Sequence, residues 1–171
     1  MKLVFPKIEH KQPTLDYCLE HIQNNETLIN GSAGLLEYAD YENYEAWLEM
    51  VEKTQTEASD GWVTHSVFFA MIEDRIIGTV AIRHYLNDEL LQEGGHIGFG
   101  VRPSERRKGY GSKMLALALK KCKELGIEKA LITCDKSNIA SAKTIEANGG
   151  VFENEIVEED GNIVRRYWIS I

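Results

Sequence analysis

The fold of this chain is decided by one segment, which reads Val101-Arg102-Pro103-Ser104-Glu105-Arg106-Arg107-Lys108-Gly109-Tyr110-Gly111-Ser112. It runs from the end of an expected strand to the start of an expected amphipathic helix. Anions bind at such places in α/β proteins because free backbone N–H groups and the helix dipole point outward. Gly109 and Gly111 permit positive φ angles and close approach of a ligand. Since three adjacent cations precede these glycines, we expect the segment to hold an anion.

Composition limits the kind of anion. The chain has 171 residues, with 19 Lys and Arg against 27 Asp and Glu and a formal net charge of −8. An acidic protein does not attract polyanions over its whole surface, so we expect no nucleic-acid partner and a local concentration of positive charge. Hydrophobic residues at 43% and charged residues at 27% are ordinary for a globular protein, which we expect to form a single domain over residues 1–171.

The cysteines and the first residues of the chain bear on its expected cellular location. No apolar run approaches the roughly 20 residues of a membrane helix, and the first six residues lack the apolar core of a secretion signal. Cys18, Cys122 and Cys134 are odd in number, lie far apart and lack the spacing of a metal-binding pair. We therefore expect a reduced, cytoplasmic protein with no membrane partner and no bound metal.

Hydrophobic periodicity predicts the secondary structure. Helical spacing marks four helices, at 15–22, 41–51, 112–125 and 138–147, and β-rich runs mark six strands, at 67–72, 76–82, 96–101, 130–134, 151–157 and 163–169. The third strand, the third helix and the apolar fourth strand form a βαβ unit, whose two strands run parallel. We expect an α/β (α+β) fold with a mixed, mostly antiparallel sheet of six or seven strands and about four flanking helices.

Two other phosphate motifs do not fit. A Walker loop is absent, and a dinucleotide fingerprint fails because Gly98-Phe99-Gly100 lies within a strand that Pro103 ends. Charge and glycines alone leave a solvated basic loop as an equal alternative.

The pattern Arg106-Arg107-Lys108-Gly109-Tyr110-Gly111, preceded by Val101-Arg102-Pro103, resembles the acyl-CoA pyrophosphate loop of the GNAT superfamily of N-acetyltransferases, [Q/R]-x-x-G-x-[G/A]. The similarity covers roughly residues 65–171 and includes Asn138 at the start of the last helix. Where the family commonly has Gly-Phe after this helix, the chain has Gly149-Gly150. Segments 95–104 and 138–143 are similar to a bacterial subgroup of acetyltransferases with unassigned substrates.

The resemblance implies acetyl-CoA as the acyl donor and a V-shaped opening between the strands that end near Val101 and Cys134. Pantetheine would pair with backbone groups of the first of these strands, and backbone amides of residues 106–111 would hold the pyrophosphate. The implied cofactor-binding residues are Phe99, Gly100, Val101, Arg106, Arg107, Lys108, Gly109, Tyr110, Gly111, Ser112, Asn138 and Ser141.

The resemblance also implies direct transfer of the acetyl group to a primary amine of a small molecule or peptide. The family's usual general acid is a tyrosine seven residues after the Asn, but this chain has Ile145 there. Tyr167 or solvent is then expected to protonate the thiolate. His96 occupies about the position of the family's usual general base, so the resemblance implies this role for it. The alternative is a histidine at the start of a strand that is hydrogen-bonded by the preceding loop. Cys134 is expected to be a buried, inert thiol.

The acceptor amine is not identified by the sequence. Acidic side chains in the N-terminal part could attract a cationic amine or simply be solvated, namely Glu37, Asp40, Glu57 and Asp60. Arg83 and His84 are expected at the acceptor side or on the surface. Family members often dimerise, so a homodimer is a further expectation. The competing interpretation is a CoA-binding sensor or structural module without catalysis, which the absence of the usual tyrosine favours.

Overall fold

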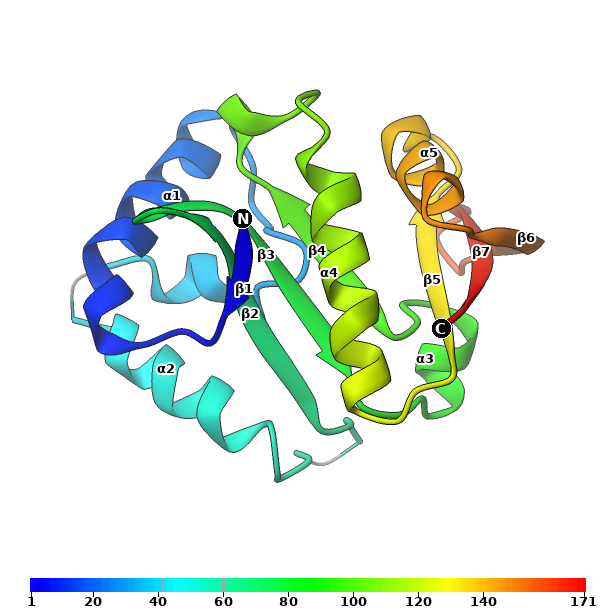
Figure 1. Cartoon of the computed structure of the whole chain (residues 1–171), viewed down its shortest axis with the longest axis horizontal. Helices are drawn as coiled ribbons and strands as arrows, with labels where there is room; N and C mark the ends of the chain where they lie inside the picture. The colour runs from blue at the N-terminus through cyan, green and yellow to red at the C-terminus, as the bar shows by residue number, and fades with distance from the viewer. Residues whose placement is uncertain (41, 60) are drawn as a thin grey trace.

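The computed structural model describes residues 1–40, 42–59 and 61–171, and within them the strands form two antiparallel sheets (Figure 1). The four-stranded sheet has the order β1-β2-β3-β4 and the three-stranded sheet the order β5-β7-β6. The first sheet comprises β1 (Lys2–Val4), β2 (His65–Ile72), β3 (Arg75–Arg83) and β4 (Ile97–Val101). The second comprises β5 (Lys129–Asp135), β6 (Val151–Val157) and β7 (Ile163–Ser170).

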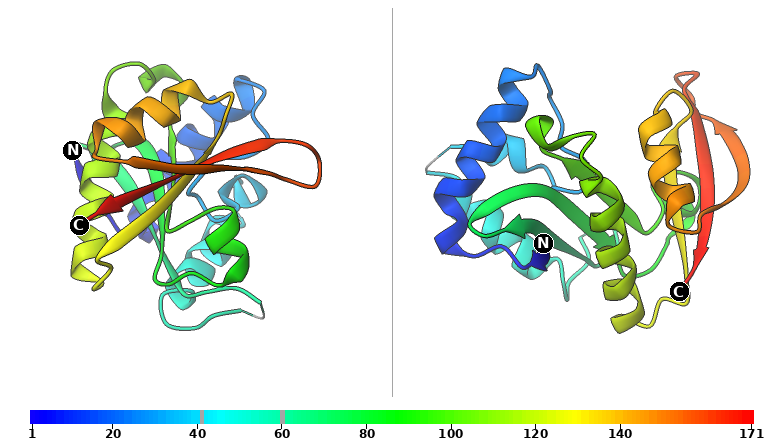
Figure 2. Two further views of the ribbon diagram at one scale, coloured as in Figure 1. Left: turned by 90° about the vertical axis from the view of Figure 1, so that its right-hand side faces the viewer. Right: turned by 45° about the horizontal axis from the view of Figure 1, so that its top comes forward.

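Helices cover both faces of the first sheet. The α-helices are α1 (Lys11–Gln23), α2 (Tyr44–Lys53), α3 (Asp88–Gln92), α4 (Tyr110–Glu124) and α5 (Ile139–Ala147). Helices α1 and α2 pack on one face and α4 on the other, while α5 lies beside α4 against the second sheet (Figures 1 and 2). None of the described helices is both long and apolar enough to cross a bilayer.

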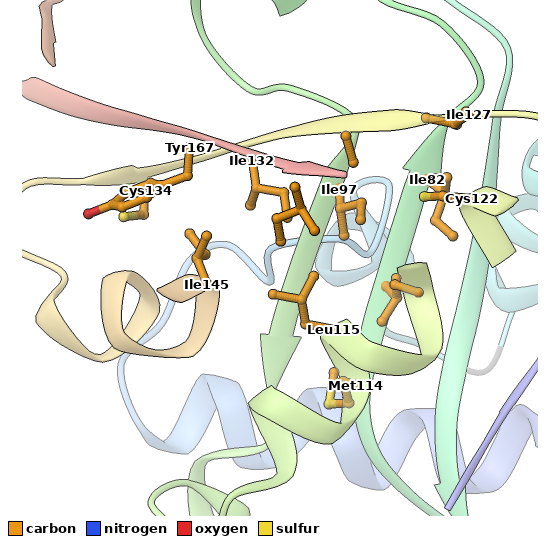
Figure 3. Packing of buried hydrophobic residues seen from close by; sticks show 14 of the residues in the cluster. Ile82, Ile97, Met114, Leu115, Cys122, Ile127, Ile132, Cys134, Ile145 and Tyr167 are labelled. Carbon is orange, nitrogen blue, oxygen red and sulfur yellow. The ribbon is translucent and has the colours of Figure 1, made fainter. Parts of the chain in front are cut away.

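Two apolar clusters stabilise these layers. One joins the apolar stripe of α4 to both sheets and to α5, and includes Met114, Leu115, Ile132 and Ile145 (Figure 3). The other packs α1 and α2 on the opposite face of the first sheet around Trp47, whose ring stacks on Phe69 at 5.7 Å. Burial of such aromatic and aliphatic side chains is the main favourable term in folding.

The expected fold class is confirmed, but the sheet is divided rather than continuous. The start of β4 approaches the middle of β5 through an isolated bridge between Gly95 and Ile132 and two hydrogen bonds, from His96 N–H to Leu131 O at 2.7 Å and from Leu131 N–H to His96 Nδ1 at 3.0 Å. From there strands β4 and β5 both run upward in Figure 1 and diverge, in agreement with the expected V-shaped opening between them. The separation leaves β4 and β5 as facing edges of different sheets.

Several elements differ from those expected. The short β1 and α3 were not expected, and α4 begins at Tyr110 instead of Ser112, so the two residues after Gly109 belong to its first turn. The helix expected from Tyr41 begins at Tyr44, and Tyr41 lies outside the described residues.

Candidate functional site

A pocket lies where β4 and β5 diverge. Its lining comes from both strands, from the start of α5, and from the loops after α1 and α3. Three residues expected at the cofactor site line it: Phe99, Asn138 and Ser141. The remaining lining is Asn30, Gly31, Arg83, Gly94, Ile97, Gly98, Thr133, Cys134, Asp135, Glu158 and Val164.

The hydrogen-bond register of β4 turns two residues towards β5. The N–H of Arg102 donates to Ile77 O at 2.8 Å, so this residue pairs with β3. Because hydrogen-bonded and non-hydrogen-bonded residues alternate along an antiparallel strand, Gly100 also faces β3, whereas Phe99 and Val101 direct their main-chain groups to the other edge. This edge offers the N–H and C=O of Phe99 and the N–H of Val101 to an extended amide-bearing ligand, since Val101 O already accepts from Arg106 Nε.

The first turn of α4 provides a second set of backbone donors. Arg107 and Gly109 both adopt left-handed conformations, with φ of 62° and 78°, and Gly109 is the N-cap residue. No side chain caps the helix among the residues that the structure describes. The N–H groups of Tyr110, Gly111 and Ser112 precede the first intrahelical donor, so they are available to an anion at the positive end of the helix dipole.

Gly111 lies in the first turn of α4. Its φ is not in the left-handed region, and a Cβ built on it would lie 3.6 to 3.8 Å from its nearest neighbours, an ordinary contact distance. Packing within the protein therefore does not require glycine here. A residue without a side chain lets a phosphate group approach the backbone N–H closely, in keeping with the expected donor site.

Arg106 is engaged within the protein. Its guanidinium donates to both carboxylate oxygens of Glu26, at 2.7 and 2.8 Å, and its Nε donates to Val101 O at 3.0 Å. Its backbone N–H donates to Pro103 O at 3.3 Å. The amide and side chain of Arg106, both expected to serve the pyrophosphate, are therefore committed elsewhere.

The expected concentration of positive charge is also smaller than the sequence suggests. Lys108 pairs with Glu105 at 3.0 Å, and Arg75 lies 3.4 Å from the same carboxylate. Arg107 is exposed and has no ion pair with any residue in 1–40, 42–59 or 61–171. Of the three adjacent cations, Arg107 thus has the most freedom to meet a ligand, and the backbone amides supply most of the site.

Helix α1 anchors residues 102–109, which we call the glycine loop. Glu20 accepts hydrogen bonds from Arg102 Nε at 2.5 Å and from Ser104 N–H at 2.7 Å. Partial burial raises the pKa of Glu20, but these hydrogen bonds outweigh it and lower the pKa to about 2. The carboxylate is therefore ionised at neutral pH and holds the start of the loop.

Asn30 and Gly31, in the segment after α1, lie against the backbone of β4 and form part of the pocket wall. A Cβ on Gly31 would collide with Gly98 O, and one on Gly100 would lie 2.8 Å from Asn30 O. The two strand glycines thus let this segment lie directly on the β4 backbone. Sequence reasoning missed Asn30 and Gly31, although Gly98-x-Gly100 within a strand is a signal of close backbone approach.

The start of α5 is organised by its N-cap. Asn138 Oδ1 accepts from Ser141 N–H at 3.0 Å, and the Asn138 amide nitrogen makes no hydrogen bond to a described residue. Ser112, by contrast, uses its hydroxyl to accept from Asn148 Nδ2 at 3.0 Å. At Ser112 the backbone N–H is therefore the group offered to a ligand.

His96 lies at the junction of β4 and β5. Its Nδ1 accepts a 3.0 Å hydrogen bond from Leu131 N–H, so the neutral ring carries its proton on Nε2. Burial, and then the charge of Arg83, lower the pKa of His96 to about 4. Its catalytic role stays a prediction, and as a base it would have to give up the bond to Leu131.

Tyr167 projects from β7 into the cluster around α5. Its hydroxyl donates to Glu146 at 3.4 Å, and Figure 3 shows its ring near Cys134 and Ile145. Burial, and then the charges of Cys134 and Glu146, raise the pKa of Tyr167, so the phenol keeps its proton at neutral pH. Tyr167 adjoins the pocket through Cys134 and remains a prediction as the general acid.

Cys134 lines the pocket but is buried, and burial raises the pKa of its thiol. A buried thiol with a raised pKa is a poor nucleophile.

The acidic residues expected to attract an amine are placed differently. Glu37, Asp40 and Glu57 are absent from the pocket lining, and Asp60 lies outside the described residues. Asp135 and Glu158 line the pocket instead, and both accept from Asn162 Nδ2, at 2.9 and 2.7 Å. Sequence reasoning missed them because the β6–β7 turn brings Glu158 to β5.

No cluster of three or more His, Cys, Asp or Glu suited to a metal ion occurs in the described part of the chain.

Comparison with known proteins assigns the family. The family model described as "Acetyltransferase (GNAT) family" matches residues 33–149. Among curated proteins, no sequence matches the chain.

Solved structures share the fold. Mycobacterium smegmatis RimJ in complex with CoA-disulfide has a TM-score of 0.74 at 14% identity, covering 98% of this chain and 80% of that one. The microcin C7 self-immunity acetyltransferase MccE with acetyl-CoA and AMP has a TM-score of 0.70 at 15% identity, covering 99% and 91%. Vibrio cholerae spermidine N-acetyltransferase SpeG has a TM-score of 0.66 at 16% identity, covering 99% and 95%. The chain therefore belongs to the acetyltransferase (GNAT) family, whose acyl donor is acetyl-CoA.

Proposed function

We propose that the protein transfers the acetyl group of acetyl-CoA directly to a primary amine of a small molecule or peptide. The observation that carries this proposal is that the open edge of β4 and the first turn of α4 both present backbone N–H groups with no hydrogen bond to a described residue. The edge groups of Phe99 and Val101 suit the amides of pantetheine, and the amides of Tyr110, Gly111 and Ser112 suit the pyrophosphate.

Acetyl-CoA supplies an activated thioester and a thiolate that leaves readily. The protein then has to position the amine, accept its proton and stabilise the charge on the reacting carbonyl. The N–H groups at the open edge of β4 suit the last task. Tyr167, protonated at neutral pH, suits donation of a proton to the thiolate. His96 or water is proposed to receive the proton of the amine.

Direct transfer is favoured over an acyl-enzyme intermediate. The only thiol in the described pocket lining is Cys134, which is buried and has a raised pKa. Initial rates measured while acetyl-CoA and an acceptor are both varied should give intersecting double-reciprocal lines. Parallel lines would indicate an acetylated enzyme and contradict this part of the proposal.

A CoA-binding module without catalysis is the second candidate. Ile145, buried at the position of the family's usual tyrosine, and the low pKa of His96 are the observations that favour it. Release of CoA from acetyl-CoA over a panel of amines separates the two candidates. Amine-dependent release supports the transferase, whereas tight CoA binding without release supports the module.

Two expectations about the protein's surroundings stay proposals. The edge strand β6 exposes Val151, Phe152 and Val157, which supports self-association through the second sheet. The three cysteines are free and buried, in keeping with a reducing, cytoplasmic location.

A further inference from the structure

Arg83, at the end of β3, lines the pocket beside the point where β4 and β5 meet. Its Nη1 donates to Gly94 O at 3.0 Å and to Gly95 O at 3.1 Å, which holds the turn before β4. The guanidinium also lies over the ring of Trp62, 5.8 Å from its centroid. One edge of the guanidinium thus has a structural role.

The other edge of the Arg83 guanidinium, formed by Nε and Nη2, has no such structural role. Nε and Nη2 make no hydrogen bond to any described residue, yet neither is among the buried side-chain atoms that lack a partner. Both atoms therefore keep some accessible surface, and Arg83 is among the residues that line the pocket. Side by side, Nε–H and Nη2–H form the fork that binds both oxygens of one carboxylate.

Arg83 also lacks a counter-charge. Its burial lowers its pKa, and no carboxylate in the described residues forms an ion pair with it. Three histidines nearby, His65, His84 and His96, have lowered pKa values and are neutral at pH 7. A partly buried cation without a counter-ion is costly, and a bound anion would offset that cost.

The pocket lining carries charges of both signs. Arg83, at the end of β3, is the only cation among the described residues that line it, whereas Asp135 on β5 and Glu158 in the β6–β7 turn are acids. A single planar guanidinium suits a monoanionic carboxylate, and the two acids disfavour a dianion such as a phosphate. The same two acids suit an ammonium group.

We propose that Arg83 binds a carboxylate of the acyl acceptor, which makes the acceptor an amino-acid-like molecule carrying both a primary amine and a carboxylate. The proposal rests on the proposed acetyl transfer, because the transfer is what requires an amine. It assigns Arg83 as the specificity-determining residue of the acceptor side.

Binding is tested separately from turnover. Saturation-transfer NMR would compare the common amino acids with their carboxamides on the CoA-bound protein, and O-phosphoethanolamine with ethanolamine. We expect at least one amino acid to bind about 10- to 100-fold more tightly than its amide, the range of a charge-assisted hydrogen bond. Equal binding of acid and amide, stronger binding of O-phosphoethanolamine, or binding by neither series overturns the proposal.

Variants locate the effect. Arg83→Gln should abolish the preference for the acid and leave the Kd for CoA unchanged, and Arg83→Lys, which keeps the charge but not the fork, should retain only part of it. Lys121→Gln removes one positive charge from an exposed pair at the far end of α4 and should change neither quantity. A preference that survives in Arg83→Gln contradicts the assignment. If amino acids bind through Arg83 but no CoA is released from acetyl-CoA, the acetyl-transfer proposal fails while the carboxylate site stands.

Discussion

Arg106 and Glu26 are joined by two parallel hydrogen bonds, 2.7 and 2.8 Å long, that tie the glycine loop to the segment following α1. Glu26 Oε2 also lies 2.7 Å from Nδ1 of the buried His21. The glycine loop, which leads into the α4 turn proposed to hold the pyrophosphate, is therefore positioned by the same segment that contributes Asn30 and Gly31 to the pocket. One ion pair thereby couples the two halves of the site.

Glu26→Gln should weaken this coupling in a pH-dependent way. The hydrogen bonds from Arg106 lower the pKa of Glu26 from its ordinary 4.5 to about 2. A depressed folded-state pKa stabilises the protein above pH 4.5, and this contribution disappears as the pH falls towards 2. We expect the variant to lose about 1 kcal/mol of unfolding free energy at pH 7, allowing for solvent screening.

Urea unfolding of both proteins from pH 7 down to pH 2 measures this difference. The matched control is Glu124→Gln, which removes an exposed i,i+3 pair with Lys121 and should change stability by only a few tenths of a kcal/mol. A Glu26→Gln effect that is the same at every pH would show that the ion pair is not its cause.

Gly111→Glu should weaken cofactor binding, whereas Gly111→Ala should not. A Cβ fits without collision at this position, and the family pattern accepts alanine here, so Gly111→Ala should keep the Tm within a degree or two and leave the Kd for CoA close to that of the parent protein. Glutamate adds bulk and a negative charge beside the amides proposed to bind the pyrophosphate, and we expect the Kd for CoA by calorimetry to rise about tenfold or more. Gly111→Ala is therefore the matched control. An unchanged Kd in Gly111→Glu would remove Gly111 from the site.

His96→Asn should reduce the acid sensitivity of the fold. The pKa of His96 falls from 6.5 to about 4 on folding, so the neutral ring stabilises the protein above pH 6.5 and this contribution is lost as the pH falls to 4. Asn can still accept from Leu131 N–H. The variant should therefore show a smaller fall in unfolding free energy between pH 6.5 and 4 than the parent protein.

The same variant tests the catalytic role of His96. If His96 is the base, kcat/KM has an acidic limb near pH 4 that His96→Asn removes. A limb near pH 6.5 that the substitution abolishes would contradict the lowered pKa.

Tyr167→Phe should lower kcat without changing the fold. The ring packs edge-on against Phe152 at 5.7 Å, and phenylalanine keeps that contact. Loss of the proton donor is expected to reduce kcat about tenfold, less than general acid catalysis usually contributes, because a thiolate leaves readily. The Kd for CoA should not change. A kcat equal to that of the parent protein would assign protonation of the thiolate to solvent.

Much of the fold could be predicted because local patterns carry it. The apolar stripe of α4 and the apolar run of β5 identify the βαβ unit, and Gly109 and Gly111 identify the anion-binding turn. Strand β1 and helix α3 escape such patterns because they are short and depend on tertiary contacts, such as the hydrogen bond from Arg166 to Leu91 O.

The site is harder to predict from the sequence because residues far apart in the chain contact one another to form it. Arg106 reads as a free cation, but its partner Glu26 lies 80 positions away in the chain. For Arg83 the sequence leaves open the acceptor side or the surface, and in the fold two carbonyls of the Gly94-Gly95 turn hold it at the pocket. Pairing and burial of charges depend on the folded arrangement, which periodicity does not specify.

The central claim is that CoA binds along the open edge of β4 and the first turn of α4. The most direct test is residue-resolved amide hydrogen exchange by NMR, with and without CoA. The account predicts slower exchange at Phe99, Val101 and Gly111 when CoA is bound, and little change at Gly100, whose N–H already faces β3. Protection elsewhere in the molecule, with exchange at these three amides unchanged, would contradict it.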